Sequence, residues 1–153
     1  SIHAARKVMG TADCFICEAD LYISDLSIFD AELSRSCYYG KMVPGFSDDW
    51  VFDWDGERIT RVGKEGTDRY NMVGVSYFKK ADAAVIRDAI DAAYEKPGYE
   101  GLYWDEIVDR KLDKLNLDIH PVEKEQIVEI DSVAELAVID ESYREVLEKM
   151  QAE

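Results

Sequence analysis

Positive charge is scarce in this sequence. Its 153 residues include 18 lysines and arginines against 33 aspartates and glutamates, which gives a formal net charge of −15. Proteins that bind nucleic acids or anionic membranes need patches of lysine and arginine that neutralise phosphates. The sequence therefore argues against both kinds of partner, and most of its acidic side chains are expected on a solvated surface.

Long hydrophobic runs are also missing. No stretch approaches the roughly 20 apolar residues that a membrane-spanning helix requires. The first seven residues lack the apolar core of a secretory signal peptide. These absences predict a cytoplasmic protein. Apolar residues nevertheless make up 47% of the chain, which is enough for a hydrophobic core. We therefore predict one domain over residues 1–153.

Cysteine is rare too, and the three residues are Cys14, Cys17 and Cys37. The first two form a C-x-x-C pattern, which in redox proteins stands at a helix N-terminus. Here the flanking apolar residues predict a buried strand, where side chains three residues apart point to opposite faces. A second C-x-x-C, which a zinc site would need, is absent. The pattern favours reduced thiols over a redox or metal site.

Stretches of strand and helix character alternate along the chain. Apolar and β-branched runs predict strands at 13–19, 36–43, 50–54, 58–62, 70–78, 117–122 and 126–130. Helical spacing predicts helical segments at 2–8, 26–33, 81–94, 103–115 and from 132 onward, where Ser132 and Glu135 have capping-box spacing. Asp55-Gly56 predicts a hairpin turn. The alternation predicts an α/β Rossmann-like mixed sheet with helices on both faces and an inserted hairpin.

Two acidic motifs suggest a metal site. Asp20 follows the apolar run at 13–19, and Asp105 opens the predicted helix at 103–115. An acid at the end of a buried strand projects into the crevice where α/β sheets bind ligands. A second acid can complete a Mg²⁺ site, because Mg²⁺ takes one or two carboxylates beside water and phosphate. Alternatively, Asp20 caps a turn and Asp105 complements the helix dipole. Glu18 either supports Asp20 or lies on the surface.

Six short motifs occur in an order shared with a known family. They are Glu18-Ala19-Asp20, Ser34-Arg35-Ser36, Asp49-Trp50, Met72-Val73-Gly74-Val75-Ser76-Tyr77-Phe78, Leu102-Tyr103-Trp104-Asp105 and Glu129-Ile130-Asp131-Ser132. Together they resemble the bacterial CTP:phosphocholine cytidylyltransferases, which have a nucleotide-diphospho-sugar-transferase-like fold. The resemblance implies Mg²⁺-dependent transfer of CMP from CTP to phosphocholine, giving CDP-choline and pyrophosphate. It makes CTP and phosphocholine the expected partners and allows a homodimer.

The same resemblance implies roles for individual residues. Asp20 and Asp105 would be the catalytic metal ligands. The implied substrate-binding residues are Trp50, Trp104, Tyr103, Tyr38 and Arg35. Aromatic faces suit the quaternary ammonium of choline, which cannot donate a hydrogen bond, and an arginine suits its phosphate. The alternatives are that the aromatic residues pack in the core and that Arg35 forms a surface ion pair.

One departure from the family is clear. The family begins with a strand and a Gly-rich loop that cradles the nucleotide phosphates, and this sequence contains no such loop. The chain therefore resembles only the C-terminal two-thirds of the family, and we expect it to be inactive by itself. Two other functions remain open. One is a sugar-1-phosphate nucleotidyltransferase, and the other is a non-catalytic remnant that binds a partner or a choline-like ligand.

Overall fold

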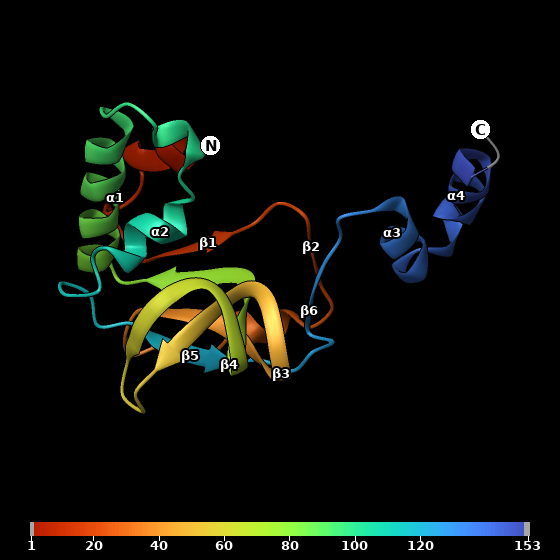
Figure 1. The fold of residues 1–153 in the computed structure, drawn as a ribbon, viewed down its shortest axis with the longest axis horizontal. Coiled ribbons are helices and arrows are strands. Elements are labelled where there is room, and N and C mark those ends of the chain that lie inside the picture. Colours follow the sequence, from red (N-terminus) through yellow and green to blue (C-terminus); the bar gives the residue numbers. More distant parts are fainter. Residues whose placement is uncertain (1, 152–153) are drawn as a thin grey trace.

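The computed structural model describes residues 2–151 and has a four-stranded mixed sheet at its centre (Figure 1). The strands lie in the order β1 (Cys14–Cys17), β4 (Ile59–Phe78), β3 (Cys37–Trp54) and β5 (Asp118–Pro121). Neighbouring strands are antiparallel except β3 and β5, which are parallel. A separate two-stranded ladder joins β2 (Leu21–Ile23) to β6 (Ile127–Glu129). The predicted mixed α/β sheet is confirmed.

The hairpin of β3 and β4 is longer and more curved than the sequence indicates. The predicted strands at 36–43 and 50–54 are parts of β3, and those at 58–62 and 70–78 are parts of β4. The intervening polar residues continue both strands through register shifts. The hairpin folds back so far that Val51 pairs with both Gly63 and Asn71. At the predicted turn, Asp55 accepts hydrogen bonds from two backbone amides, and Gly56 has φ +100°.

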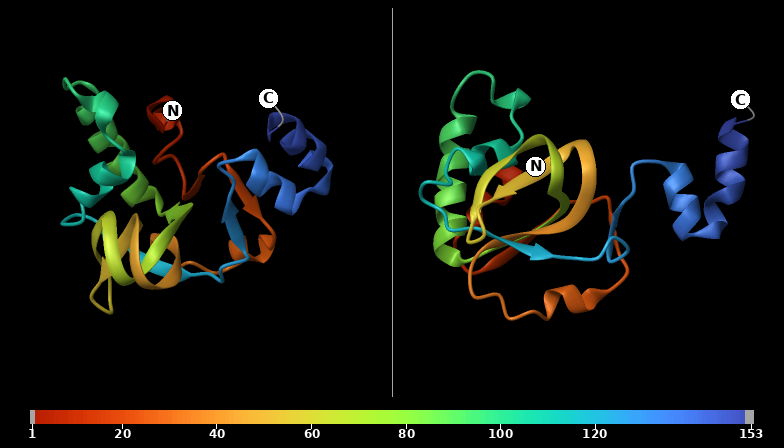
Figure 2. Two further views of the ribbon diagram at one scale, coloured as in Figure 1. Left: turned by 45° about the vertical axis from the view of Figure 1, so that its right-hand side comes forward. Right: turned by 60° about the horizontal axis from the view of Figure 1, so that its bottom comes forward.

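Two α-helices cover one face of the sheet (Figures 1 and 2). Helix α1 (Lys80–Tyr94) matches the predicted helix at 81–94, and its apolar stripe enters the main core. Helix α2 (Trp104–Asp109) ends earlier than the predicted 103–115. Successive tight turns follow α2. The segment after them buries Leu115 and Leu117 and leads into the extended strand β5. The carboxylate of Asp109 accepts from the Val62 amide at 2.8 Å, which ties α2 to β4.

The opposite face carries a smaller hydrophobic core. A 3₁₀ turn, η2 (Leu26–Phe29), covers it where the sequence predicts a helical turn. Tyr39 is completely buried there and donates to the Ile28 carbonyl at 2.7 Å. A second 3₁₀ segment, η1 (Ile2–Lys7), replaces the predicted N-terminal helix and is followed by Gly10 at φ +78°.

The C-terminal helices extend away from the sheet in every view (Figures 1 and 2). They comprise α3 (Val133–Ile139), the turn η4 (Glu141–Tyr143) and α4 (Arg144–Gln151). Elsewhere, a fourth 3₁₀ segment, η3 (Tyr99–Gly101), precedes α2. Ser132 caps α3 by accepting from the Glu135 amide at 3.2 Å, but the Glu135 carboxylate accepts from the Asp131 amide at 2.9 Å, so the reciprocal bond of the predicted capping box is not formed. Within residues 2–151, no helix is long and apolar enough to cross a membrane.

Candidate functional site

Three carboxylates form a cluster where strand β2 begins and its antiparallel partner β6 ends. Glu18, Asp20 and Glu129 each offer an oxygen, and these oxygens lie within 4.8 Å of one another. The backbone holds the two segments together, since the Ile130 amide donates to the Asp20 carbonyl at 2.8 Å. We call these three residues the acidic cluster.

Gly74 allows Glu18 to enter the acidic cluster. The Glu18 amide donates to the Gly74 carbonyl at 2.9 Å, and Gly74 has φ +74°. A Cβ atom on Gly74 would lie 2.7 Å from a carboxylate oxygen of Glu18, closer than real Cβ contacts. Glycine therefore serves two purposes here: it adopts the left-handed backbone and leaves room for the carboxylate.

The electrostatics of the acidic cluster favour a bound cation. The pKa of Glu18 is raised by partial burial and then by the neighbouring charges of Asp20, Asp49 and Asp131. Burial and the same acidic neighbours also raise the pKa of Glu129. Among the described residues, no lysine or arginine forms an ion pair with the cluster. Carboxylate oxygens of this kind suit Mg²⁺, Mn²⁺ or Ca²⁺.

Asp105, the second predicted metal ligand, lies outside this set of three. Its side chain is buried at 3% exposure and accepts a 2.9 Å hydrogen bond from the hydroxyl of Tyr38. The pKa of Asp105 is raised to about 7, chiefly by burial and less by the charge of Glu18, while the hydrogen bond from Tyr38 acts in the opposite direction. Asp105 is thus within electrostatic reach of the cluster, but its hydrogen bond points it at the core.

The predicted aromatic residues divide into two groups. Trp104 and Tyr38 pack in the main core, where each contacts Phe78 and their own rings are stacked 6.1 Å apart. Trp50 and Tyr103 instead meet edge to face, with ring centroids 5.5 Å apart. The structure therefore pairs Trp50 with Tyr103, and Trp104 supports the core beside them.

Trp50 and Tyr103 form part of a pocket between the β3–β4 hairpin and α2. The pocket has a volume of about 570 Å³, and its walls include Trp50, Arg61, Lys64, Tyr103, Glu106 and Asp109. Asp49 directly precedes Trp50, and its charge acts on Glu18 and Glu129 of the acidic cluster. We call this space the hairpin pocket.

Arg35 lies at a different place on the sheet. Its guanidinium donates to Asp118 at 2.6 Å and to Asn116 at 3.5 Å, near the start of β5. This is the surface ion pair that the sequence left open as the alternative to phosphate binding.

Three residues of this region were given no site role from the sequence: Glu129 and Asp131, which stand in one of the six motifs, and Lys64. The pattern of an acid, one residue and a second acid occurs at both 18–20 and 129–131. That repetition, at the ends of two predicted strands, was a usable signal for the first two. Lys64 gives no comparable signal, because only the folded hairpin brings it to the aromatic pair.

Changing Gly74 to alanine should weaken divalent cation binding and lower the free energy of unfolding by about 1–2 kcal/mol through left-handed backbone strain. The added methyl also displaces Glu18, and isothermal titration with Mg²⁺ would measure the consequence. Gly45→Ala is the matched control, since Gly45 has φ +81° but a Cβ added there would have no atom within 4 Å. Equal loss of cation affinity in both variants would contradict the role of the Glu18 contact.

No family model matches the chain. Two curated proteins are similar to it. A 2-aminoethylphosphonate cytidylyltransferase from Lancefieldella rimae is 50% identical over 144 residues, covering 94% of this chain and 58% of that protein. A choline-phosphate cytidylyltransferase from Streptococcus pneumoniae is 26% identical over 131 residues, covering 85% of this chain and 57% of that protein. The chain thus spans somewhat more than half the length of these relatives.

Solved structures share the fold. The CTP:phosphocholine cytidylyltransferase from Streptococcus pneumoniae superimposes with a TM-score of 0.78 at 23% identity, covering 92% of this chain and 60% of that chain. The inositol-1-phosphate CTP transferase from T. maritima superimposes with a TM-score of 0.56 at 15% identity, covering 94% of this chain and 58% of that chain. The fold is therefore that of nucleotidyltransferases. Over 144 residues the chain is also similar in sequence to a cytidylyltransferase, of which it covers 58%.

Proposed function

We propose that this chain forms the metal and acceptor side of a cytidylyltransferase. The observation that carries the proposal is an acidic cluster in a chain that also forms the hairpin pocket, where Trp50 directly follows Asp49, whose charge acts on Glu18. Glu18, Asp20 and Glu129 would hold a divalent cation, which neutralises phosphate charge and orients the reacting groups. The hairpin pocket would take the organic part of the acceptor.

The proposed reaction needs no nucleophile from the protein. An oxygen of the acceptor's phosphonate or phosphate attacks the α-phosphorus of CTP, the new P–O bond forms, and the bond to the departing pyrophosphate breaks. Both reactants are anions, so three clustered carboxylates would repel them. The acidic cluster therefore fits this reaction only as a cation site, while the pocket residues orient the acceptor.

The acceptor we propose is 2-aminoethylphosphonate, with phosphocholine as the second candidate. The relative that is 50% identical carries the first name, and the 26% identical relative carries the second. Each molecule joins an anionic group to an ammonium group, which is primary in 2-aminoethylphosphonate and quaternary in phosphocholine. The pocket walls include the carboxylates of Glu106 and Asp109, and a carboxylate attracts such a cation. A sugar phosphate carries no cation and would lack this attraction.

Pyrophosphate release tests this proposal in the native protein, meaning the full-length protein together with any nucleotide-binding segment that precedes these residues. With CTP and Mg²⁺, we expect the highest kcat/KM for 2-aminoethylphosphonate, a lower value for phosphocholine and a much lower value for glucose-1-phosphate. EDTA should abolish the reaction, and added Mg²⁺ should restore it. ATP in place of CTP is the control for the nucleotide. A preference for glucose-1-phosphate would favour the sugar alternative, and turnover of none of the three would favour the non-catalytic remnant.

A further inference from the structure

Lys64 places a cation against the aromatic pair of the hairpin pocket. Its Nζ atom lies 5.7 Å from the centroid of the Trp50 ring and 5.4 Å from that of Tyr103. Trp50 and Lys64 are partners in the β3–β4 ladder, so their side chains leave the same face. An ammonium within about 6 Å of an aromatic centroid is attracted to the ring. The chain's own ammonium therefore fills the cation position of this pair.

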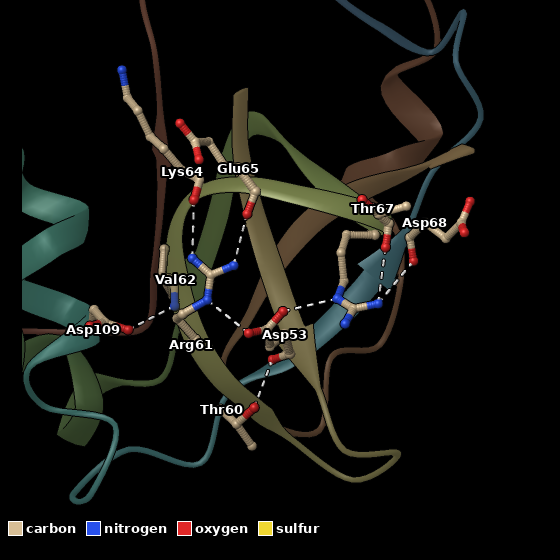
Figure 3. A network of polar contacts seen from close by, with 10 residues as sticks. Asp53, Thr60, Arg61, Val62, Lys64, Glu65, Thr67, Asp68 and Asp109 are labelled. Carbon is tan, nitrogen blue, oxygen red and sulfur yellow. Dashed lines mark hydrogen bonds and ion pairs between the residues drawn. The ribbon is translucent and has the colours of Figure 1, made fainter. Parts of the chain in front are cut away.

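The backbone that carries Lys64 is held in place by a polar network (Figure 3). Arg61 donates to the carbonyl of Lys64 at 3.2 Å and to that of Glu65 at 3.0 Å. The Asp53 carboxylate accepts a hydrogen bond from Nε of Arg61 at 2.7 Å and another from Nε of Arg69 at 2.9 Å. Glu65 has φ +66°, a left-handed conformation that residues other than glycine adopt infrequently. The network thus stabilises the bend from which Lys64 reaches the rings.

The ammonium of Lys64 forms no ion pair with a carboxylate within residues 2–151. Figure 3 shows its ammonium extending away from the Arg61 network. A second cation that approached Trp50 and Tyr103 would meet this charge at close range and be repelled. Such a ligand can occupy the rings only if Lys64 leaves them.

We propose that Lys64 is a specificity-determining residue that fills the cation position at Trp50 and Tyr103 and so disfavours acceptors with a quaternary ammonium group. The inference rests on the proposed function, because it concerns the choice of acceptor at the same pocket. A quaternary ammonium cannot donate hydrogen bonds and depends on aromatic faces. A primary ammonium donates three hydrogen bonds, and carboxylates such as those of Glu106 and Asp109 in the pocket walls can accept them.

The test is Lys64→Ala in the native protein, with two measurements. The first is the ratio of kcat/KM for phosphocholine to that for 2-aminoethylphosphonate, which should rise about tenfold as the rings become free for choline. The second is quenching of tryptophan fluorescence by choline alone, which should appear in the variant at concentrations that leave the wild type unchanged. Lys64→Arg keeps a cation over the rings and should keep the wild-type ratio.

Two further variants make the test specific. Lys79→Ala removes the same charge and uncovers Tyr77, whose ring centroid lies 5.3 Å from the Lys79 ammonium, so it should leave the ratio unchanged. Adding Trp50→Leu to Lys64→Ala should abolish both the gain in ratio and the choline signal. A gain that survives without the Trp50 ring would overturn the inference.

The outcomes for Lys64 and for the proposed function are separable. If the wild type uses 2-aminoethylphosphonate but Lys64→Ala changes neither the ratio nor choline binding, the inference is wrong and the proposed function stands. If the wild type uses neither acceptor, the proposed function fails. In that case choline binding by Lys64→Ala, with and without Trp50, still decides whether Lys64 occupies the cation position.

Discussion

Replacing Asp20 with asparagine should reduce Mg²⁺-dependent turnover of the native protein by about 100-fold or more, since losing even an indirect partner of a metal ligand costs 10–100-fold. Asparagine keeps the size of the side chain but removes one of the three charges that face the proposed cation. The loss should be greatest at limiting Mg²⁺ and partly recovered at high Mg²⁺. Pyrophosphate release measured across a Mg²⁺ titration would show both effects.

Glu129→Gln should behave like Asp20→Asn, because both side chains belong to the acidic cluster. Asp30→Asn is the control, since it also removes one negative charge but lies at the end of η2, where its amide donates to the Ser27 carbonyl. A wild-type Mg²⁺ dependence in Asp20→Asn would exclude this residue as a ligand. A loss in Asp20→Asn without any loss in Glu129→Gln would restrict the cation site to residues 18–20.

Asp105→Asn should make the protein more stable above pH 7 and flatten the dependence of its stability on pH. The folded pKa of about 7 is higher than the ordinary value of 3.8 because the carboxyl is buried. The folded state therefore binds more protons than the unfolded state between these values, and stability falls as pH rises from about 4 to about 7. The difference corresponds to at most about 4 kcal/mol at pH 8, which asparagine would remove.

Urea unfolding in EDTA at pH 5 and pH 8 would measure this effect. Tyr38→Phe is the informative companion, because the Tyr38 hydroxyl stabilises the charged form of Asp105 through its 2.9 Å hydrogen bond. Without this hydrogen bond, the loss of stability at pH 8 should be larger than in the wild type.

The same Asp105→Asn protein also tests the predicted metal role of Asp105. Unchanged turnover together with raised stability would identify Asp105 as a buried structural acid, and a Mg²⁺-dependent loss would support it as a ligand.

Elements with strong periodicity could be predicted from the sequence. Helix α1 was predicted to within one residue at its start, because its apolar positions recur at helical spacing over the whole length. The turn at Asp55-Gly56 was equally clear from its residue types. The continuity of β3 and β4 could not be predicted, because polar residues and Gly45 interrupt the alternation of apolar and polar residues that indicates a strand. Pairing between the two strands stabilises these residues, and pairing is not visible in a local pattern.

The candidate site was predicted only in part for the same reason. Asp20 follows a recognisable apolar run, and the structure places it in the acidic cluster. Asp105 and Trp104 stand in a motif with the same residue types as a binding site, yet both side chains face inward from α2. Whether a residue faces the core or the pocket depends on how α2 docks on the hairpin. The bond between Asp109 and the Val62 amide sets that docking, and no local pattern predicts it.

The long hairpin also has a consequence for how the protein acquires its site during folding. Pairing of β3 with β4 begins beside the turn, where Trp54 pairs with Ile59, and each further pair extends a loop that is already closed, so it costs little loop-closure entropy. The acidic cluster instead joins Glu18 to Glu129, near opposite ends of the chain. We therefore expect the strand-borne wall of the hairpin pocket, with Trp50 and Lys64, to form early. Cation binding would follow only after the last strand has paired, so a nascent chain carries part of the acceptor wall before it can bind the metal.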